Sequence, residues 1–279
     1  MKLSEIKEIL AQRGLVLTKS LGQNFMHDSN QVRRMIQCAS LAPGDPVLEI
    51  GPGLGPLTEY LLAAGCPVLA IEKDLRLCDC LQERLGGQAG LEIIHADALD
   101  YLKAQSRPWR DWTLVSNLPY SVGSRLLMEL ALGPEPPKKL VATLQLEVIQ
   151  RLVARPGTAA YGALTLLLGL RYQPGSWFKI PASCFHPEPE VDSGCVVLER
   201  RASPLLTTAQ QLDYDRIVRR SFSQRRKMML KLLKTDWPAA ALEAAFAGAG
   251  LSLQCRAEDA SFEQYLNLTR LLGGSATHE

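Results

Sequence analysis

The feature that most constrains the fold is a change of pattern along the chain. From Val47 onwards, short runs rich in β-branched residues alternate with stretches whose apolar residues recur every three or four positions. This alternation is typical of a parallel α/β sheet. After Pro204 only the helical pattern continues. We therefore predict a doubly wound α/β domain over 1–203 and a small all-helical C-terminal domain over 204–279.

The predicted elements follow directly from this pattern. The expected strands are 47–50, 67–72, 91–95, 113–116, 140–144 and 195–198. The expected helices between them are 57–64, 75–85, 121–132 and 148–154, and those of the second domain are 213–234, 238–249 and 261–272. A chain of 279 residues, 47% of them hydrophobic, is long enough to bury a core in each domain.

Composition excludes several classes of protein. No stretch approaches the roughly 20 apolar residues that span a bilayer, and the N-terminus lacks the apolar core of a signal peptide. The seven cysteines include no CxxC pair, and the four histidines stand apart from any cysteine at metal-ligand spacing. We therefore expect a cytoplasmic protein with reduced thiols, no membrane contact and no metal.

A glycine-rich segment follows the first predicted strand of the sheet. Gly51, Gly53 and Gly55 lie between the apolar strand 47–50 and a helix, where glycines allow a tight turn and close approach of a ligand to the backbone. The spacing is GxGxG, and Pro56 stands where a dinucleotide fingerprint has its third small residue. The segment therefore favours a nucleoside-type ligand over a pyrophosphate.

Two carboxylates end the next two predicted strands. Glu72 is placed to accept the hydroxyl hydrogens of a ribose, and Asp97 to accept an adenine amino group. Each has an ordinary alternative: Glu72 could be a solvated strand-end acid, and Asp97 a helix N-cap. Because the carboxyl ends of parallel strands meet at one edge of a sheet, the three strand ends together indicate a nucleoside-type cofactor.

The fourth strand ends in Asn117, Leu118, Pro119 and Tyr120. An adenine amino nitrogen is a poor nucleophile because its lone pair is delocalised into the ring. The side-chain oxygen of Asn117 and the carbonyl of Leu118 could hold its two hydrogens and direct the lone pair at an electrophile, and Pro119 would fix that carbonyl. Tyr120 offers a face on which a base can stack. The alternative is an ordinary turn.

Basic residues gather in the last third of the chain. Eight lie between positions 216 and 234, and no acid lies among them. We expect the strongest contacts with a phosphate backbone from Arg219, Arg220, Arg225, Arg226 and Lys227. Arg33 and Arg34 could extend this surface. The alternative is a solvated helix face, since the net charge is only +2.

These motifs together resemble the rRNA adenine dimethyltransferase family, and within it the bacterial small-subunit enzymes. The segments that carry the resemblance span the chain in order: 21–25 (LGQNF), 49–58, 117–120, 145–148, 161–162, 185–193 and 222–227. The resemblance implies a Rossmann-like class I methyltransferase domain and S-adenosyl-L-methionine as cofactor. It also implies that Asn24 and Met26 contact the cofactor alongside Gly51, Glu72, Asp97 and Asn117, and that Phe185 forms a wall of the adenine pocket.

The resemblance also implies a substrate. It is small-subunit (16S) rRNA within an assembling 30S particle, where the 6-amino groups of two adjacent adenosines in the 3′-terminal hairpin loop are each methylated twice. We expect a monomer. The family usually has Leu at Met26 and more polar residues at 228–231, which leaves the RNA contact beyond the basic cluster open.

Three alternatives are kept. A large-subunit rRNA adenine methyltransferase of the macrolide-resistance type shares the fold and reacting motif, but that group usually has Ile where Leu118 stands. A non-catalytic ribosome assembly factor would bind RNA and cofactor without transferring a methyl group. An NAD-dependent oxidoreductase is disfavoured by Pro56.

Overall fold

The computed structural model describes residues 1–17, 22–104 and 107–273, so Leu21 of the 21–25 motif lies outside the described residues. The chain divides into two compact units. Unit 1 comprises 1–149 and 174–200, and unit 2 comprises 150–173 together with the chain from Arg201. The predicted boundary between 203 and 204 differs from this division because segment 150–173 belongs to unit 2.

A seven-stranded sheet forms the centre of unit 1, in the order β4-β3-β2-β5-β6-β9-β7. Its strands are β2 (Val47–Ile50), β3 (Val68–Glu72), β4 (Leu91–His95), β5 (Thr113–Asn117), β6 (Lys139–Gln145), β7 (Tyr172–Ile180) and β9 (Ser193–Arg200). The strands β2 to β6 pair in parallel, as expected for an α/β fold, whereas β9 runs antiparallel to β6. The prediction of a wholly parallel sheet was therefore wrong at this edge, where β7 is an additional strand.

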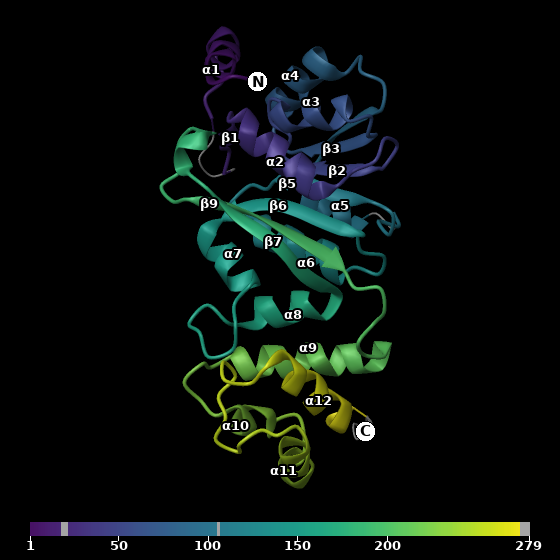
Figure 1. Ribbon diagram of the computed structural model, residues 1–279, viewed down its shortest axis with the longest axis vertical. Coiled ribbons are helices and arrows are strands. Elements are labelled where there is room, and N and C mark those ends of the chain that lie inside the picture. The colour runs from purple at the N-terminus through teal and green to yellow at the C-terminus, as the bar shows by residue number, and fades with distance from the viewer. Residues whose placement is uncertain (18–21, 105–106, 274–279) are drawn as a thin grey trace. The chain divides into compact units, whose positions relative to one another are not determined.

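The helices of unit 1 cover both faces of this sheet. They are α1 (Leu3–Gln12), α2 (Ser29–Ala39), α3 (Pro56–Ala63), α4 (Leu75–Leu85), α5 (Ala98–Ala104) and α6 (Gly123–Leu132), and α7 (Leu146–Leu152) leads into unit 2. In β6, the Thr143 hydroxyl contacts the sulfur of Met35 on α2, while a Cβ built on Gly123 of α6 would lie 2.5 Å from Leu144. Because neighbouring strand residues point to opposite faces, α2 and α6 lie on opposite sides of the sheet (Figure 1).

A two-stranded sheet lies beside the cavity of unit 1. Strand β1 (Phe25–Met26) pairs antiparallel with β8 (Phe185–His186), so Phe25 faces His186 and Met26 faces Phe185. A short 3-10 helix, Ala182–Cys184, precedes β8. This pairing brings the two family motifs at 21–25 and 185–193 together.

Unit 2 is helical. It contains α8 (Ala163–Arg171), α9 (Thr208–Phe222), α10 (Met229–Leu233), α11 (Ala239–Gly248) and α12 (Phe262–Leu272). The Tyr214 hydroxyl on α9 donates to the Leu166 carbonyl on α8 at 3.0 Å, and Phe222 stacks on Tyr265 with ring centroids 6.3 Å apart. Helix α8 packs with α9 in this core, which explains why 150–173 separates from the α/β unit.

The predicted helix over 213–234 was wrong as a single element. It is two helices, α9 and α10, separated by a turn at 223–228. At this turn Met228 forms a β-bridge with Arg256, and the Met229 amide donates to the Cys255 carbonyl at 2.9 Å. Pairing with this distant segment takes the chain out of the helix, so Arg225, Arg226 and Lys227 lie on a turn.

Three further features concern membrane spans, metal sites and cysteines. Within the described ranges, no helix is both long and apolar enough to cross a bilayer. Among the same residues no cluster of His, Cys, Asp and Glu could hold a metal ion. All seven cysteines are unpaired, and five are buried.

Candidate functional site

A cavity of about 230 Å³ opens at the carboxyl ends of the parallel strands. It is lined by residues from the predicted motifs: Asn24, Met26, Gly51, Gly53, Glu72, Asp97, Asn117 and Pro119. Segments almost a hundred residues apart in sequence therefore meet at one edge of the sheet. The predicted convergence of the strand ends at one edge of the sheet is confirmed, and their binding of a ligand stays a prediction.

The glycine-rich loop keeps side chains out of the cavity. Gly53 has φ +58°, and a Cβ built on it would lie 2.4 Å from the ring of Phe25. Gly55, with φ +84°, begins α3, and a Cβ there would lie 2.6 Å from Leu81 of α4. Gly53 therefore has no room for a side chain because the Phe25 ring fills that space at the cavity wall, whereas Gly55 serves the packing of α3 on α4 and does not line the cavity.

Glu72 organises the loop from the end of β3. Its Oε2 accepts from the Gly53 amide at 3.0 Å, and its Oε1 accepts from the amides of Lys73 and Asp74 at 2.9 Å each. The side chain is only 6% exposed, which contradicts the alternative of a solvated acid. Burial raises the pKa of Glu72, while the three amide bonds oppose that shift. One lone-pair site remains on Oε2 for a further donor.

Asp97 has two roles. Its Oδ1 accepts from the Leu99 amide at 2.9 Å at the start of α5, so the N-cap alternative is correct. Its Oδ2 accepts from the Lys73 ammonium at 2.7 Å, and this bond lowers the pKa of Asp97. Asp97 also lines the cavity, so the cap holds the carboxylate in place at the ligand-binding edge.

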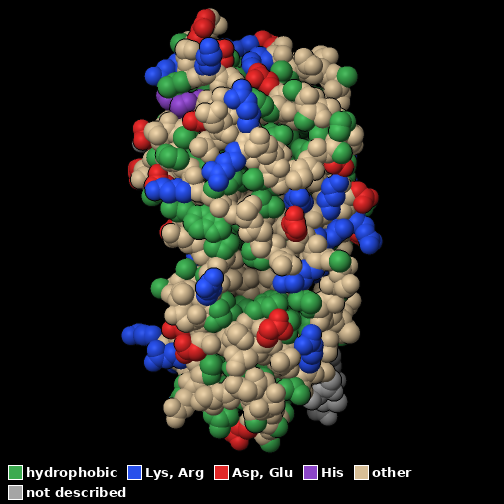
Figure 2. Space-filling view, viewed as in Figure 1, with side chains coloured by type: hydrophobic (Ala, Val, Ile, Leu, Met, Phe, Trp, Pro, Cys, Tyr) green, Lys and Arg blue, Asp and Glu red, His purple; other side chains and the backbone are tan. Residues whose placement is uncertain are grey.

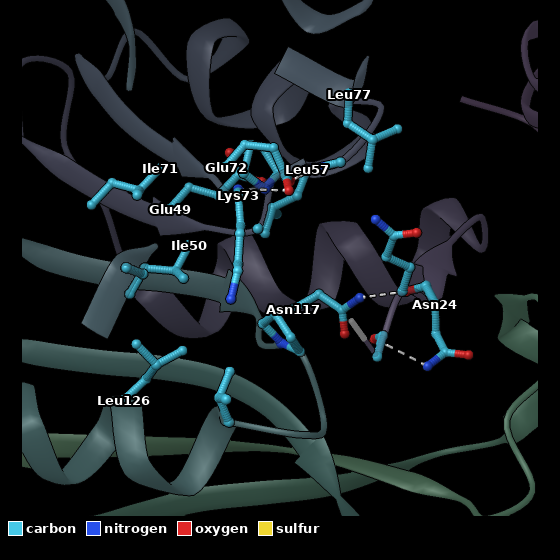
Figure 3. A pocket seen from close by; sticks show the side chains of 18 of the residues that line it. Asn24, Glu49, Ile50, Leu57, Ile71, Glu72, Lys73, Leu77, Asn117 and Leu126 are labelled. Carbon is cyan, nitrogen blue, oxygen red and sulfur yellow. Dashed lines mark hydrogen bonds between the residues drawn. The ribbon is translucent and has the colours of Figure 1, made fainter. Parts of the chain in front are cut away.

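Asn117 is the last residue of β5, and its side-chain amide has a hydrogen-bonded nitrogen and an unsatisfied oxygen. Its Nδ2 donates to the Asn24 carbonyl at 2.8 Å, and its Oδ1 is buried with no hydrogen-bond partner among the described residues. Because a carbonyl repels the amide oxygen, this bond fixes which end of the amide faces the cavity. Figure 3 shows the Asn117 side chain directed towards Asn24. The Asn117 Oδ1 is therefore an oriented acceptor without a donor among the described residues.

The other residues of the reacting motif are placed differently. Leu118 is 1% exposed, and its amide donates to the Thr143 carbonyl at 3.2 Å. The Tyr120 hydroxyl is hydrogen-bonded to Ser193 at the start of β9. Phe185 is 2% exposed and packs in the core beneath β1. Pro119 lines the cavity, whereas Leu118, Tyr120 and Phe185 do not.

A third acid lies deep in the cavity wall. Glu49 is 2% exposed and accepts from the Thr58 hydroxyl at 2.7 Å. Burial raises the pKa of Glu49 to about 8, although the bond from Thr58 opposes this shift. Glu49 is therefore mostly neutral near pH 7, whereas the Lys73 ammonium lowers the pKa of Asp97 and keeps that carboxylate ionised.

The residues of this site fit S-adenosylmethionine. Gly53 presents only its backbone at the cavity wall, Glu72 Oε2 can accept from a ribose hydroxyl, and Asp97 can accept from an amino group. The cavity also includes apolar side chains that the sequence analysis did not single out: Val32, Met35, Leu57, Ile71, Leu77, Leu99 and Leu126. Their apolar character does not distinguish them from core residues, so no sequence signal could have found them.

The basic residues of unit 2 are partly neutralised. Arg219 pairs with Asp215 at 2.8 Å, Arg220 with Asp236 at 2.8 Å, and Arg225 with Glu258 at 3.3 Å. Within the described part of the chain, Arg226 and Lys227 have no carboxylate at ion-pair distance. On the face seen in Figure 2, Lys and Arg side chains alternate with Asp and Glu rather than forming one basic field. The acid-free run in the sequence is therefore not acid-free in space.

Comparisons with known proteins point in one direction. A family model described as "Ribosomal RNA adenine dimethylase" matches residues 15–273. The chain is 38% identical over 276 residues to the ribosomal RNA small subunit methyltransferase A of Cereibacter sphaeroides, covering 98% of both chains. It is 36% identical over 274 residues to the protein of that name from Moorella thermoacetica, covering 95% of each.

Two solved structures share the architecture. The 23S rRNA methyltransferase ErmE matches with a TM-score of 0.71 and 29% identity, over 89% of this chain and 99% of its own. A dimethyladenosine transferase from Plasmodium falciparum matches with a TM-score of 0.71 and 25% identity, over 88% of this chain and 95% of its own. These similarities confirm the Rossmann-like methyltransferase fold.

Proposed function

The chain belongs to the ribosomal RNA adenine dimethylase family and is an S-adenosylmethionine-dependent rRNA adenine dimethyltransferase; on this premise we propose its target and the role of each site residue. The target is small-subunit (16S) rRNA, at the 6-amino groups of two adjacent adenosines in the 3′-terminal hairpin loop. The enzyme acts during assembly of the 30S particle. The names of the curated relatives support this target.

The observation that carries the proposal is the buried, unpartnered Oδ1 of Asn117. A buried acceptor without a donor is destabilising by about 1 to 3 kcal/mol, so it is retained where a ligand supplies the donor. An adenine amino group has two hydrogens to donate. Asn117 Oδ1 accepts one and the Leu118 carbonyl accepts the other, which directs the nitrogen lone pair away from the ring.

The cofactor would be held by the strand ends. Glu72 binds its ribose hydroxyls, Asp97 its adenine amino group, and Asn24, Met26, Gly51 and Gly53 line the space that it enters. When bound, S-adenosylmethionine supplies a methyl group on a positively charged sulfur, already a strong electrophile. Asn117 and Leu118 align the amino nitrogen with that group, and alignment is the main contribution required of the protein.

The target base reaches the site by leaving its stack. Tyr120 offers a face for stacking, and its bond to Ser193 fixes the ring orientation. Phe185 would form the second wall. Because Phe185 is buried, this role requires the β1–β8 pair, to which Phe185 belongs, to shift when RNA binds.

In unit 2 we assign RNA phosphate contacts to Arg226 and Lys227 first, since their charges are uncompensated among the described residues. Arg219, Arg220 and Arg225 contribute less because each already has a carboxylate partner. The enzyme acts as a monomer in the cytoplasm: one chain supplies the whole cavity, and its curated relatives come from bacteria, whose ribosomes assemble there.

The alternatives separate in one experiment. Purified protein is incubated with labelled S-adenosylmethionine and undermethylated small subunits, and the modified nucleosides are mapped by mass spectrometry. We expect two adjacent dimethyladenosines near the 3′ end of the small-subunit rRNA. Dimethyladenosine formed only in large-subunit RNA, supplied in parallel, would establish the macrolide-resistance type. Binding of RNA and cofactor without transfer would establish an assembly factor.

A further inference from the structure

Helix α2 carries two adjacent arginines that neither the cofactor site nor the basic turn of unit 2 uses. Arg33 and Arg34 are both exposed, whereas their neighbours Val32 and Met35 line the cavity. The two arginines are therefore within one helical turn of the cavity wall. We propose that Arg33 and Arg34 form a phosphate-binding clamp for the RNA strand that delivers the target adenosine, an inference that rests on the proposed function.

The charge of this pair is uncompensated. Helix α2 contains no Asp or Glu, and its N-cap Asp28 is occupied by the amides of Asn30 and Gln31. On the neighbouring helix α3, Glu59 is paired with Arg84. In the described part of the chain neither Arg33 nor Arg34 has a carboxylate partner. Two full positive charges thus face solvent beside the cavity.

Aromatic rings hold these guanidinium groups in place. The Arg34 Cζ lies 3.7 Å from the centroid of the Phe178 ring on β7, and the Arg33 Cζ lies 5.7 Å from that of Tyr60 on α3. A guanidinium stacked on a ring keeps its N–H donors at its edge, where they are available to a phosphate. For Arg34 no hydrogen-bond acceptor is found among the described residues, and Arg33 has only two long bonds of 3.4 Å, to Ser29 and Asn30.

The position of α2 assigns the pair to the substrate half of the cavity. The cofactor acids end β3 and follow β4, while the reacting residues end β5. Helix α2 packs on β5, β6 and β9, and Arg34 reaches β7 at the sheet edge beyond them. Figure 1 shows α2 crossing in front of the sheet. A strand inserting a base above β5 would therefore pass its phosphates near these arginines.

Salt dependence tests the clamp. Each phosphate contact makes the slope of log affinity against log salt steeper by about 0.7 to 0.9, which is a roughly threefold greater loss of affinity between 50 and 200 mM salt. Binding to undermethylated small subunits at constant magnesium is compared for the wild type and the double variant Arg33→Gln/Arg34→Gln. We expect the variant to lose about tenfold less affinity than the wild type over this range.

Two controls make the result specific. Arg107 stacks on Trp109 and Trp112 with Cζ 5.7 and 5.4 Å from the ring centroids, but it precedes β5, at the edge of the sheet away from the cavity. Arg107→Gln removes the same charge as one clamp substitution and should leave the slope unchanged. Arg34→Lys keeps the charge and should retain most of the salt dependence.

The outcomes separate the clamp from the proposed function. Cofactor affinity should match the wild type in Arg33→Gln/Arg34→Gln, because neither arginine lines the cavity. A salt slope in this variant equal to that of the wild type would overturn the clamp, as would an equal change in Arg107→Gln. Absence of methyl transfer by the wild type would instead reject the proposed function, and the slopes would still decide whether the arginines contact the particle.

Discussion

The cavity of unit 1 and the basic segment of unit 2 were both predicted from patterns, with different outcomes. At the cavity, Glu72, Asp97 and Asn117 were identified by their places at strand ends, and parallel strands bring such ends to one edge. In the basic segment, the prediction depended only on the absence of acids between 216 and 234. Asp215, Asp236 and Glu258 lie just outside that run or farther along the chain and neutralise three of its arginines. The place of a residue at a strand end thus predicts where it lies in the folded protein. A count of charges along the sequence does not predict which of them are paired.

The strictest test of the predicted cavity site is Asn117→Ala. This change removes the oriented acceptor while leaving the strand intact, and loss of a donor or acceptor aimed at a reacting centre typically lowers the rate about 10²- to 10³-fold. We expect that loss in methyl transfer, measured with labelled cofactor at saturating small subunits.

The companion measurements are cofactor affinity by calorimetry and thermal unfolding. The melting temperature should change little, since the Asn24 carbonyl that Asn117 Nδ2 contacts can be solvated when the amide is lost, and the cofactor affinity shows how much of the lost rate comes from cofactor binding. Turnover close to the wild-type value would show that the unpartnered Oδ1 has no part in orienting the amino group.

The sequence predicted most of the α/β unit because its elements are locally encoded. Strands β2, β4 and β5 agree with prediction to within one residue, since each is a β-branched run bounded by turn residues. Helix α2 and strand β7 were missed. Their apolar residues are interrupted by polar ones such as Arg33, Arg34 and Lys179, and packing against the sheet determines their structure.

The residues of the cavity were also predictable only in part. Polar groups at strand ends, such as Glu72 and Asn117, carry a chemical signal, whereas Val32 and Met35 look like core residues until α2 is placed over the sheet. The buried state of Phe185 and the turn at 223–228 depend on pairing between distant segments, β1 with β8 and Met228 with Arg256. Such pairings have no local signature.

Glu49 allows a test of protein stability, because its environment is also set by its position in a strand. A carboxyl whose pKa is raised in the folded state stabilises the fold below the unfolded value of 4.5, and this stability is lost as the pH rises towards about 8. The loss is about 1.4 kcal/mol per pH unit within that window. We expect the free energy of unfolding to fall by about 2 to 3 kcal/mol between about pH 5.5 and pH 7.5 from this group.

The measurement is urea unfolding of the wild type and Glu49→Gln across this range. The variant should show a flatter pH profile, since glutamine does not titrate and can still accept from the Thr58 hydroxyl. Glu72, whose pKa is also raised, contributes to the residual slope in both proteins. Parallel profiles for the two proteins would mean that Glu49 is ionised in the folded state at neutral pH.

The smallest expected effect tests the basic segment of unit 2. The double variants Arg226→Gln/Lys227→Gln and Arg219→Gln/Arg220→Gln each remove two positive charges, but only the second pair has carboxylate partners in the structure. Removing two uncompensated phosphate contacts should reduce the slope of log affinity against log salt by about 1.4 to 1.8, and the paired arginines should contribute less.

The readout is binding to undermethylated small subunits between 50 and 200 mM salt, with cofactor affinity as the control for folding. Arg219→Gln/Arg220→Gln should mainly lower the melting temperature slightly, because Asp236 is only 16% exposed and loses its partner. If both variants reduced the slope equally, the ion pairs would have to open on RNA binding. The acid-free run of the sequence would then describe the RNA-bound state better than the ion pairs of the free protein do.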